Sequence, residues 1–125
     1  MNKRLVITLM ALGLASCTVK DESYYRANPR ELQQVIKNCP NEHPAQFSCE
    51  QAQALGNRMN SLAYQLQFSP QGFGNKILKL QETIAAQELE LAKKTDVELQ
   101  QALDENKKDL ADYMAVVKWL ESPEG

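Results

Sequence analysis

The chain has 125 residues, of which 43% are hydrophobic and 24% charged, with 14 Lys and Arg against 16 Asp and Glu. This length allows one small domain, and a net charge of −2 lacks the excess of basic residues that grips a nucleic-acid backbone. Five Gly and five Pro exclude collagen-like and low-complexity chains, and the Leu-, Ala-, Gln-, Lys- and Glu-rich composition favours helix. We therefore expect no nucleic-acid partner.

Residues 1–16 are predicted to be a secretory signal peptide. Two basic residues precede an uncharged apolar run over residues 5–14, which is too short to span a bilayer. The tetrapeptide Leu-Ala-Ser-Cys that ends at Cys17 resembles the lipobox of bacterial lipoproteins, whose Cys is acylated and becomes the new N-terminus. Cys17 is therefore the predicted lipidation site. The alternative is an ordinary signal peptide with an incidental Cys at this position.

Acylation would place the protein at a membrane. Removal of residues 1–16 leaves 109 residues with a net charge of −4. Several acyl chains hold a protein stably on a bilayer, whereas one holds it only marginally. Thr18, where resemblance to inner-membrane lipoproteins would require Asp, favours the outer membrane. We expect a periplasm-facing protein in the cell envelope, tethered through residues 17–27.

The two remaining cysteines, Cys39 and Cys49, are predicted to form a disulfide. They make an even pair in an oxidising compartment, and closing a loop of this length contributes about 2–3 kcal/mol on the chain-entropy model. A redox-active or metal-binding pair is the alternative, but the spacing is not C-x-x-C and His43 is the one other soft ligand nearby. We expect no metal and no cofactor.

Residues 28–68 are predicted to form a disulfide-bridged pair of helices, of which the first runs from Pro29 to Asn38. Asn28 supplies an N-cap side chain, Pro29 stands at the first helical position and Glu31 at the third.

The second helix is predicted over residues 49–68. Ser48 and Gln51 form a capping box at its start. Apolar residues recur at spacings of three and four, as a buried face requires. They are Ala52, Leu55, Met59, Leu62, Ala63 and Leu66.

Residues 69–125 are predicted to be a long C-terminal helical segment. Its first residues belong to a predicted turn over residues 68–74. The segment over residues 75–120 contains no Gly or Pro, but its two apolar stripes are out of phase, and a third capping box, Thr95 to Glu98, lies at the discontinuity. We therefore expect a break near Lys94 or a phase shift in one long helix. The first stripe comprises Ile77, Leu80, Ile84 and Leu91, and the second Leu99, Leu103, Asn106, Leu110, Tyr113, Val117 and Leu120.

The second stripe alternates spacings of four and three, as in a short coiled coil. Either it folds back on its own domain, or it serves self-association or docking to a partner. The fold class follows: an all-α domain of three to four helices, with one disulfide joining the first two and a long C-terminal amphipathic helix or helix pair.

Catalytic chemistry is not supported by any motif. A nucleophile needs a base and an orienting group, and the chain has one His and no G-x-S-x-G, P-loop or H-E-x-x-H pattern. Glu105 and Lys107 match half of a nuclease metal site, a pattern too common to be specific. A secreted nuclease is therefore a weak alternative, and we expect no enzyme and no catalytic residues.

One resemblance sharpens the functional prediction. One pattern in the chain runs Asp21-x-x-Tyr24-Tyr25-x-x-Asn28-Pro29-x-Glu31-Leu32, followed by Ile36-x-x-Cys39 and by nine residues before Cys49. This pattern resembles that of the EexN family of small lipoproteins. That family is associated with entry exclusion in conjugative plasmids and with type IV secretion clusters. The resemblance covers residues 1–55, and the C-terminal segment has no counterpart in it.

The resemblance implies an interaction protein that binds a conjugation or type IV secretion component. Tyr24, Tyr25, Asn28 and Pro29 are the predicted partner contacts, because paired Tyr supply rigid contact area at low entropic cost. The alternative for the tyrosines is that one packs on the first helix and the other rests near lipid headgroups. The alternative function is a structural lipoprotein subunit of an envelope or secretion complex.

Overall fold

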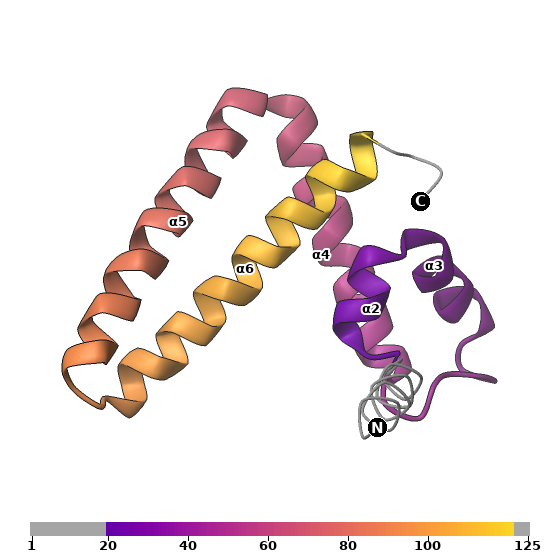
Figure 1. The fold of residues 1–125 in the computed structure, drawn as a ribbon. Coiled ribbons are helices and arrows are strands. Elements are labelled where there is room, and N and C mark those ends of the chain that lie inside the picture. Colours follow the sequence, from indigo (N-terminus) through magenta and orange to yellow (C-terminus); the bar gives the residue numbers. More distant parts are fainter. Residues whose placement is uncertain (1–19, 122–125) are drawn as a thin grey trace, which may run out of the picture.

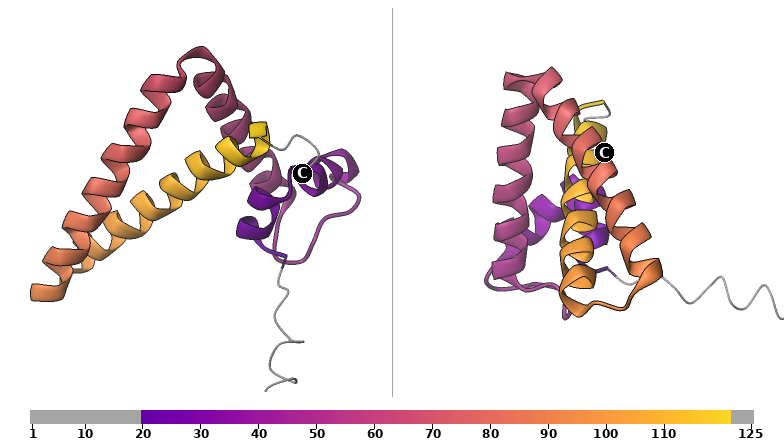
Figure 2. Two further views of the ribbon diagram at one scale, coloured as in Figure 1. Left: turned by 45° about the horizontal axis from the view of Figure 1, so that its top comes forward. Right: turned by 90° about the vertical axis from the view of Figure 1, so that its left-hand side faces the viewer.

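The computed structural model describes residues 20–121, which form five α-helices and no strand (Figure 1). The predicted all-α fold with a disulfide is confirmed, and of the two alternatives for the C-terminal segment the chain adopts the helix pair. The described residues form five helices, whereas three to four were expected. The helices are α2 (Glu22–Ala27), α3 (Pro29–Asn38), α4 (Cys49–Phe68), α5 (Pro70–Lys93) and α6 (Val97–Glu121). The short helices α2 and α3 lie beside the start of α4, whereas the three long helices form a triangle (Figures 1 and 2).

Helix α2 lies inside the segment that the sequence analysis assigned to a tether. The Asp21 side chain accepts a hydrogen bond from the backbone N–H of Tyr24 at 3.2 Å and caps the helix. The prediction for Asn28 was wrong in its detail. Its side chain donates to the Tyr24 carbonyl at 2.8 Å and so closes α2, and it makes no cap bond to α3. Pro29 occupies the first turn of α3, as predicted.

Helix α4 has the predicted bounds and capping box. Ser48 accepts from the backbone N–H of Gln51, and Gln51 accepts from that of Ser48. The predicted stripe faces the core, with Ala52, Leu55, Met59 and Leu62 buried. Gly56 allows α3 to approach closely, since a Cβ there would lie 2.9 Å from Cδ1 of Ile36.

The predicted turn over residues 68–74 is restricted to Ser69. Pro70 already lies in the first turn of α5, where its missing N–H costs nothing, and the Ser69 side chain accepts from the backbone N–H of Gly72. Of the two alternatives near Lys94, the chain adopts the break. The cap of α6 is Asp96 rather than Thr95, because the Asp96 carboxylate accepts from the N–H of Leu99 at 3.1 Å.

Helices α5 and α6 form a hairpin in which the two apolar stripes meet. Ile84 and Leu103 are buried, the Asn106 side chain donates to Oε1 of Gln87 at 3.1 Å, and Phe73 packs edge-on against Tyr113. The helices converge toward their connecting turn and spread apart toward α4 (Figure 2). The second stripe therefore folds back on its own chain.

The main core lies where α2, α3, α4 and the end of α6 meet. Val116 is fully buried, and Nε1 of Trp119 donates to the backbone carbonyl of Arg26 at 2.9 Å. Helix α6 thus packs against α2 and is hydrogen-bonded to it. The buried core side chains are Tyr25, Leu32, Val35, Phe47, Ala52, Leu55, Met59, Leu62, Phe73 and Val116.

Candidate functional site

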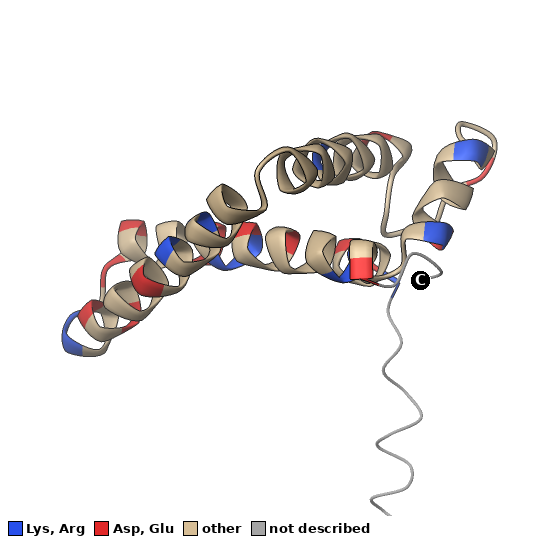
Figure 3. Cartoon of the chain, turned by 90° about the horizontal axis from the view of Figure 1, so that it is seen from above, with Lys and Arg blue, Asp and Glu red and all other residues tan. Residues whose placement is uncertain are grey.

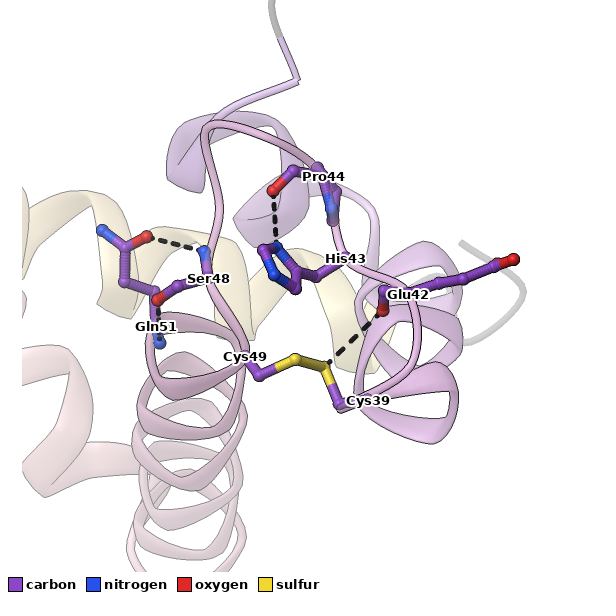
Figure 4. Close-up of a disulfide and its surroundings, with 7 residues drawn as sticks. All are labelled: Cys39, Glu42, His43, Pro44, Ser48, Cys49 and Gln51. Carbon is purple, nitrogen blue, oxygen red and sulfur yellow. Dashed lines mark hydrogen bonds between the residues drawn. A yellow bond between two sulfur atoms is a disulfide. The ribbon is translucent and has the colours of Figure 1, made fainter.

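The predicted disulfide is present between Cys39 and Cys49, whose Cα atoms are 5.8 Å apart (Figure 4). Cys39 ends α3 and Cys49 begins α4, so the bond joins the two helices as expected. The loop between them carries Phe47, which is fully buried and stacks on Tyr25 at 4.6 Å between ring centroids. The disulfide therefore closes a loop that contributes a core side chain.

His43 lies on the exposed part of this loop, with Nδ1 2.9 Å from the carbonyl oxygen of Pro44 (Figure 4). Within residues 20–121, no group of three or more His, Cys, Asp or Glu side chains is placed to hold a metal ion. Glu105 and Lys107 are both exposed, and Lys107 pairs with Glu88 of α5 at 3.8 Å.

The four predicted partner contacts have different environments. Tyr25 is 4% exposed and belongs to the core, as the alternative for one of the two tyrosines proposed. Tyr24, Asn28 and Pro29 are half-buried, and we call these three residues the N-terminal patch. The Tyr24 ring packs edge-on against Tyr25 at 5.2 Å.

Charged groups surround the Tyr24 ring. Nζ of Lys20 lies 5.4 Å from the ring centroid and 3.9 Å from the Glu31 carboxylate. Glu31 raises the pKa of the Tyr24 hydroxyl, chiefly as a hydrogen-bond acceptor for its protonated form. The phenol is therefore neutral and can donate a hydrogen bond over the physiological pH range.

Sequence reasoning missed an ion-pair cluster, formed by Arg26, Arg58, Asp109 and Asp112. Asp112 is 1% exposed, and its two oxygens accept from Nε of Arg26 and Nε of Arg58, each at 2.5 Å. Arg58 also donates to Asp109 at 2.8 Å, and this pairing, with Asp112 as its main hydrogen-bond partner, raises the pKa of Arg58. The cluster joins α2, α4 and α6.

A second missed feature is the aromatic corner, formed by Tyr64 and Phe68 at the end of α4. Their side chains are 67% and 80% exposed, and the rings stack at 6.1 Å. The signal in the sequence was two aromatic residues four positions apart and off the buried stripe, a spacing that places them on one helix face.

Cys17, the predicted lipidation site, lies outside the described residues. None of the described helices is long and apolar enough to cross a membrane.

Comparisons of the chain with protein-family models, with curated proteins and with solved structures find no match. The class of protein defined here is therefore a structural one: an all-helical domain with one disulfide between its α3 and α4 helices.

Proposed function

We propose that this protein is a lipid-anchored, periplasm-facing envelope protein that acts by binding a conjugation or type IV secretion component. The lipobox ending at Cys17 supports the anchor, and the likeness of residues 1–55 to the EexN family supports the partner class. In this proposal the protein acts as an entry-exclusion factor: the tethered domain occupies a surface of the transfer apparatus and so blocks mating or DNA entry.

The observation that carries the proposal is the rigid presentation of the N-terminal patch. Tyr24, Asn28 and Pro29 lie at one helix junction, and the Asn28 side chain is hydrogen-bonded to the Tyr24 carbonyl. Burial of Tyr25 and the bond from Trp119 to Arg26 hold this junction against the rest of the domain. Contact groups that are already ordered lose little conformational entropy on binding, which favours a recognition surface.

The proposal is tested by donor-to-recipient transfer into cells that express the protein from its native gene neighbourhood. We expect deletion to raise the transfer frequency, and Tyr24→Ala to raise it nearly as far at a matched protein level. Leu89→Ala, on the exposed outer face of α5, is the matched control and should keep exclusion intact. Transfer that is unchanged by deletion would refute the exclusion function.

The anchor is tested separately by the intact mass of the mature chain. We expect an acylated chain that starts at Cys17, and Cys17→Ser should give an unacylated chain that is released from the membrane fraction.

A structural subunit of an envelope or secretion complex is the second candidate, favoured by the α5–α6 hairpin. The hairpin projects from the core, and α5 exposes Leu78 and Leu89 at 58% and 66% (Figure 1). A permanent scaffold predicts a stoichiometric partner in the same envelope after mild crosslinking, whereas exclusion predicts a transient partner from another cell.

A further inference from the structure

The aromatic corner is an apolar projection that the chain does not cover. Tyr64 and Phe68 stack on each other on the side of α4 opposite its buried stripe, and two-thirds or more of each side chain is exposed. Exposing two adjacent aromatic side chains forfeits the free energy of burying them, so this pair is a candidate contact surface.

A hollow beside the corner is lined by one basic side chain and by no carboxylate. This hollow has a volume of about 280 Å³, and its other lining residues offer an amide, a hydroxyl and the ammonium of Lys76. Lys79 follows one turn later on α5 and lines a neighbouring hollow together with Lys76 and Asp109 of α6, but neither lysine lies within ion-pair distance of a carboxylate within residues 20–121. All 16 acidic residues lie outside residues 51–81, and α4 is almost free of charged positions in Figure 3.

The corner also has a defined place relative to the N-terminal end of the domain. Helix α4 begins at Cys49, next to the disulfide and near the start of α2, and ends at Phe68 (Figure 1). Its 20 residues give a length of about 30 Å. The corner and the N-terminal end of the described chain are therefore at opposite ends of one straight helix.

We propose that the aromatic corner binds the surface of an anionic bilayer, with Tyr64 and Phe68 at the level of the headgroups and Lys76 and Lys79 facing lipid phosphates. Aromatic and basic side chains together are the composition that bilayer interfaces select, and each lysine near an anionic surface adds attraction. The contact is weak alone, and it rests on the anchor proposed at Cys17 to keep lipid near the domain. For the corner to reach the same bilayer, α4 must lie along the membrane surface, because the corner is about 30 Å from the anchored end.

Two other occupants fit the observations less well. A second copy of this corner would bring four lysines close together, and their mutual repulsion disfavours self-association through it. A stable protein interface buries about 800 Å² on each partner, and two protruding side chains beside a small hollow offer only part of that area. A deformable lipid surface needs no shape complementarity.

The proposal is tested with a reporter at the corner itself. Phe68→Trp is introduced into the full chain, reconstituted in vesicles of phosphatidylethanolamine and phosphatidylglycerol that contain brominated acyl chains. The signal of the native Trp119 is subtracted with the parent chain, and Leu89→Trp is the matched exposed control. Both replaced side chains are mostly exposed, and equal unfolding midpoints would verify that the fold is kept.

We expect the residue 68 reporter to shift to shorter wavelength and to be quenched by brominated lipid, and the residue 89 reporter to be unaffected. The double variant Lys76→Gln, Lys79→Gln should lower the equilibrium constant for contact between the corner and lipid about thirtyfold. Equal quenching at positions 68 and 89, equal quenching in phosphatidylcholine vesicles, or a shift at position 68 that needs protein concentration instead of lipid would each overturn the proposal.

This readout does not depend on the proposed function. The reporter at position 68 measures lipid contact whatever holds the N-terminus at the vesicle, whereas acylation and transfer frequency measure the anchor and the exclusion activity.

Discussion

Replacing Asp112 by Ala should be among the most destabilising single changes in the domain. The carboxylate is 1% exposed and accepts from two guanidinium groups, but the two partners differ. The Arg26 side chain is 10% exposed and would keep only Glu22, at 3.3 Å, whereas Arg58 is 43% exposed and would keep Asp109. The cost therefore comes mainly from leaving the Arg26 charge buried with a weaker partner.

The expected loss is about 3–4 kcal/mol, in the range found when one member of a buried ion pair is removed. This is a large part of the 5–15 kcal/mol by which ordinary domains are stable, and it should lower the urea midpoint by about 2 M. Arg58→Ala should cost about 1 kcal/mol or less, because solvent screens the exposed side of its pair. Equilibrium urea unfolding followed by helical circular dichroism measures both.

A double variant distinguishes a buried charge from a simple packing defect. Arg26→Met with Asp112→Val replaces both charges by apolar groups closer to them in volume and should recover most of the loss, since such replacements are often neutral. The reasoning is refuted if Asp112→Ala costs no more than Arg58→Ala, or if the double variant loses as much as its two component substitutions, at Arg26 and at Asp112, lose when each is made alone.

Reduction of the Cys39–Cys49 disulfide should lower the free energy of unfolding by about 2–3 kcal/mol, measured by urea unfolding with and without reductant. Phe47→Ala should cost about 4 kcal/mol in the same assay, because this side chain is fully buried and the loop cannot refill its space. Tyr24 should titrate above pH 10 by ultraviolet absorbance, and Glu31→Gln should lower its pKa toward 10.0. The raised pKa means that the folded state favours the protonated phenol, so this contribution to stability is fully present at pH 7 and should be lost as the pH rises above 10.

Each of these predictions has a matched control. Phe68→Ala removes the same ring from an 80% exposed position and should change stability by less than about 0.5 kcal/mol. Reductant should not affect a Cys39→Ala, Cys49→Ala variant, which isolates the disulfide. Tyr24→Phe should remove its share of the late absorbance change and leave that of Tyr25, whose pKa is also raised, chiefly by burial. An equal loss for Phe47→Ala and Phe68→Ala would contradict the burial argument.

Local signals predicted the bounds of α3 and α4 well, although the turn expected over residues 68–74 placed the start of α5 too late. Ser48 and Gln51 form a reciprocal cap whose chemistry depends on neighbours in sequence alone, so the start of α4 could be predicted to the residue. The disulfide could also be predicted, because the two remaining cysteines form an even pair and an oxidising compartment was expected. Helix α2 was not predicted, because its six residues are too few to show a helical repeat of apolar positions, although Asp21 caps it.

Residues that act across the chain could not be predicted in the same way. Nothing in the sequence pattern singled out Asp112, because its role depends on Arg26 and Arg58, which are 86 and 54 residues away. A second buried face of α6 is formed by Asp112, Val116 and Trp119. It does not follow the predicted apolar stripe, and a charged residue belongs to it. Helix α6 packs against α5 with its first half and against α2 and α4 with its second, so its buried face changes along its length.

The bonds that link Arg26 to Asp112 and Trp119 also constrain the order of folding. They connect positions 86 and 93 residues apart, so the environment of α2 is incomplete until nearly all of the chain is present. In a chain that is made or translocated from its N-terminus, α2 would be present before its partners in α6. A truncation before Trp119 should therefore release helix α2 first, although it is the element most distant from the cut in sequence.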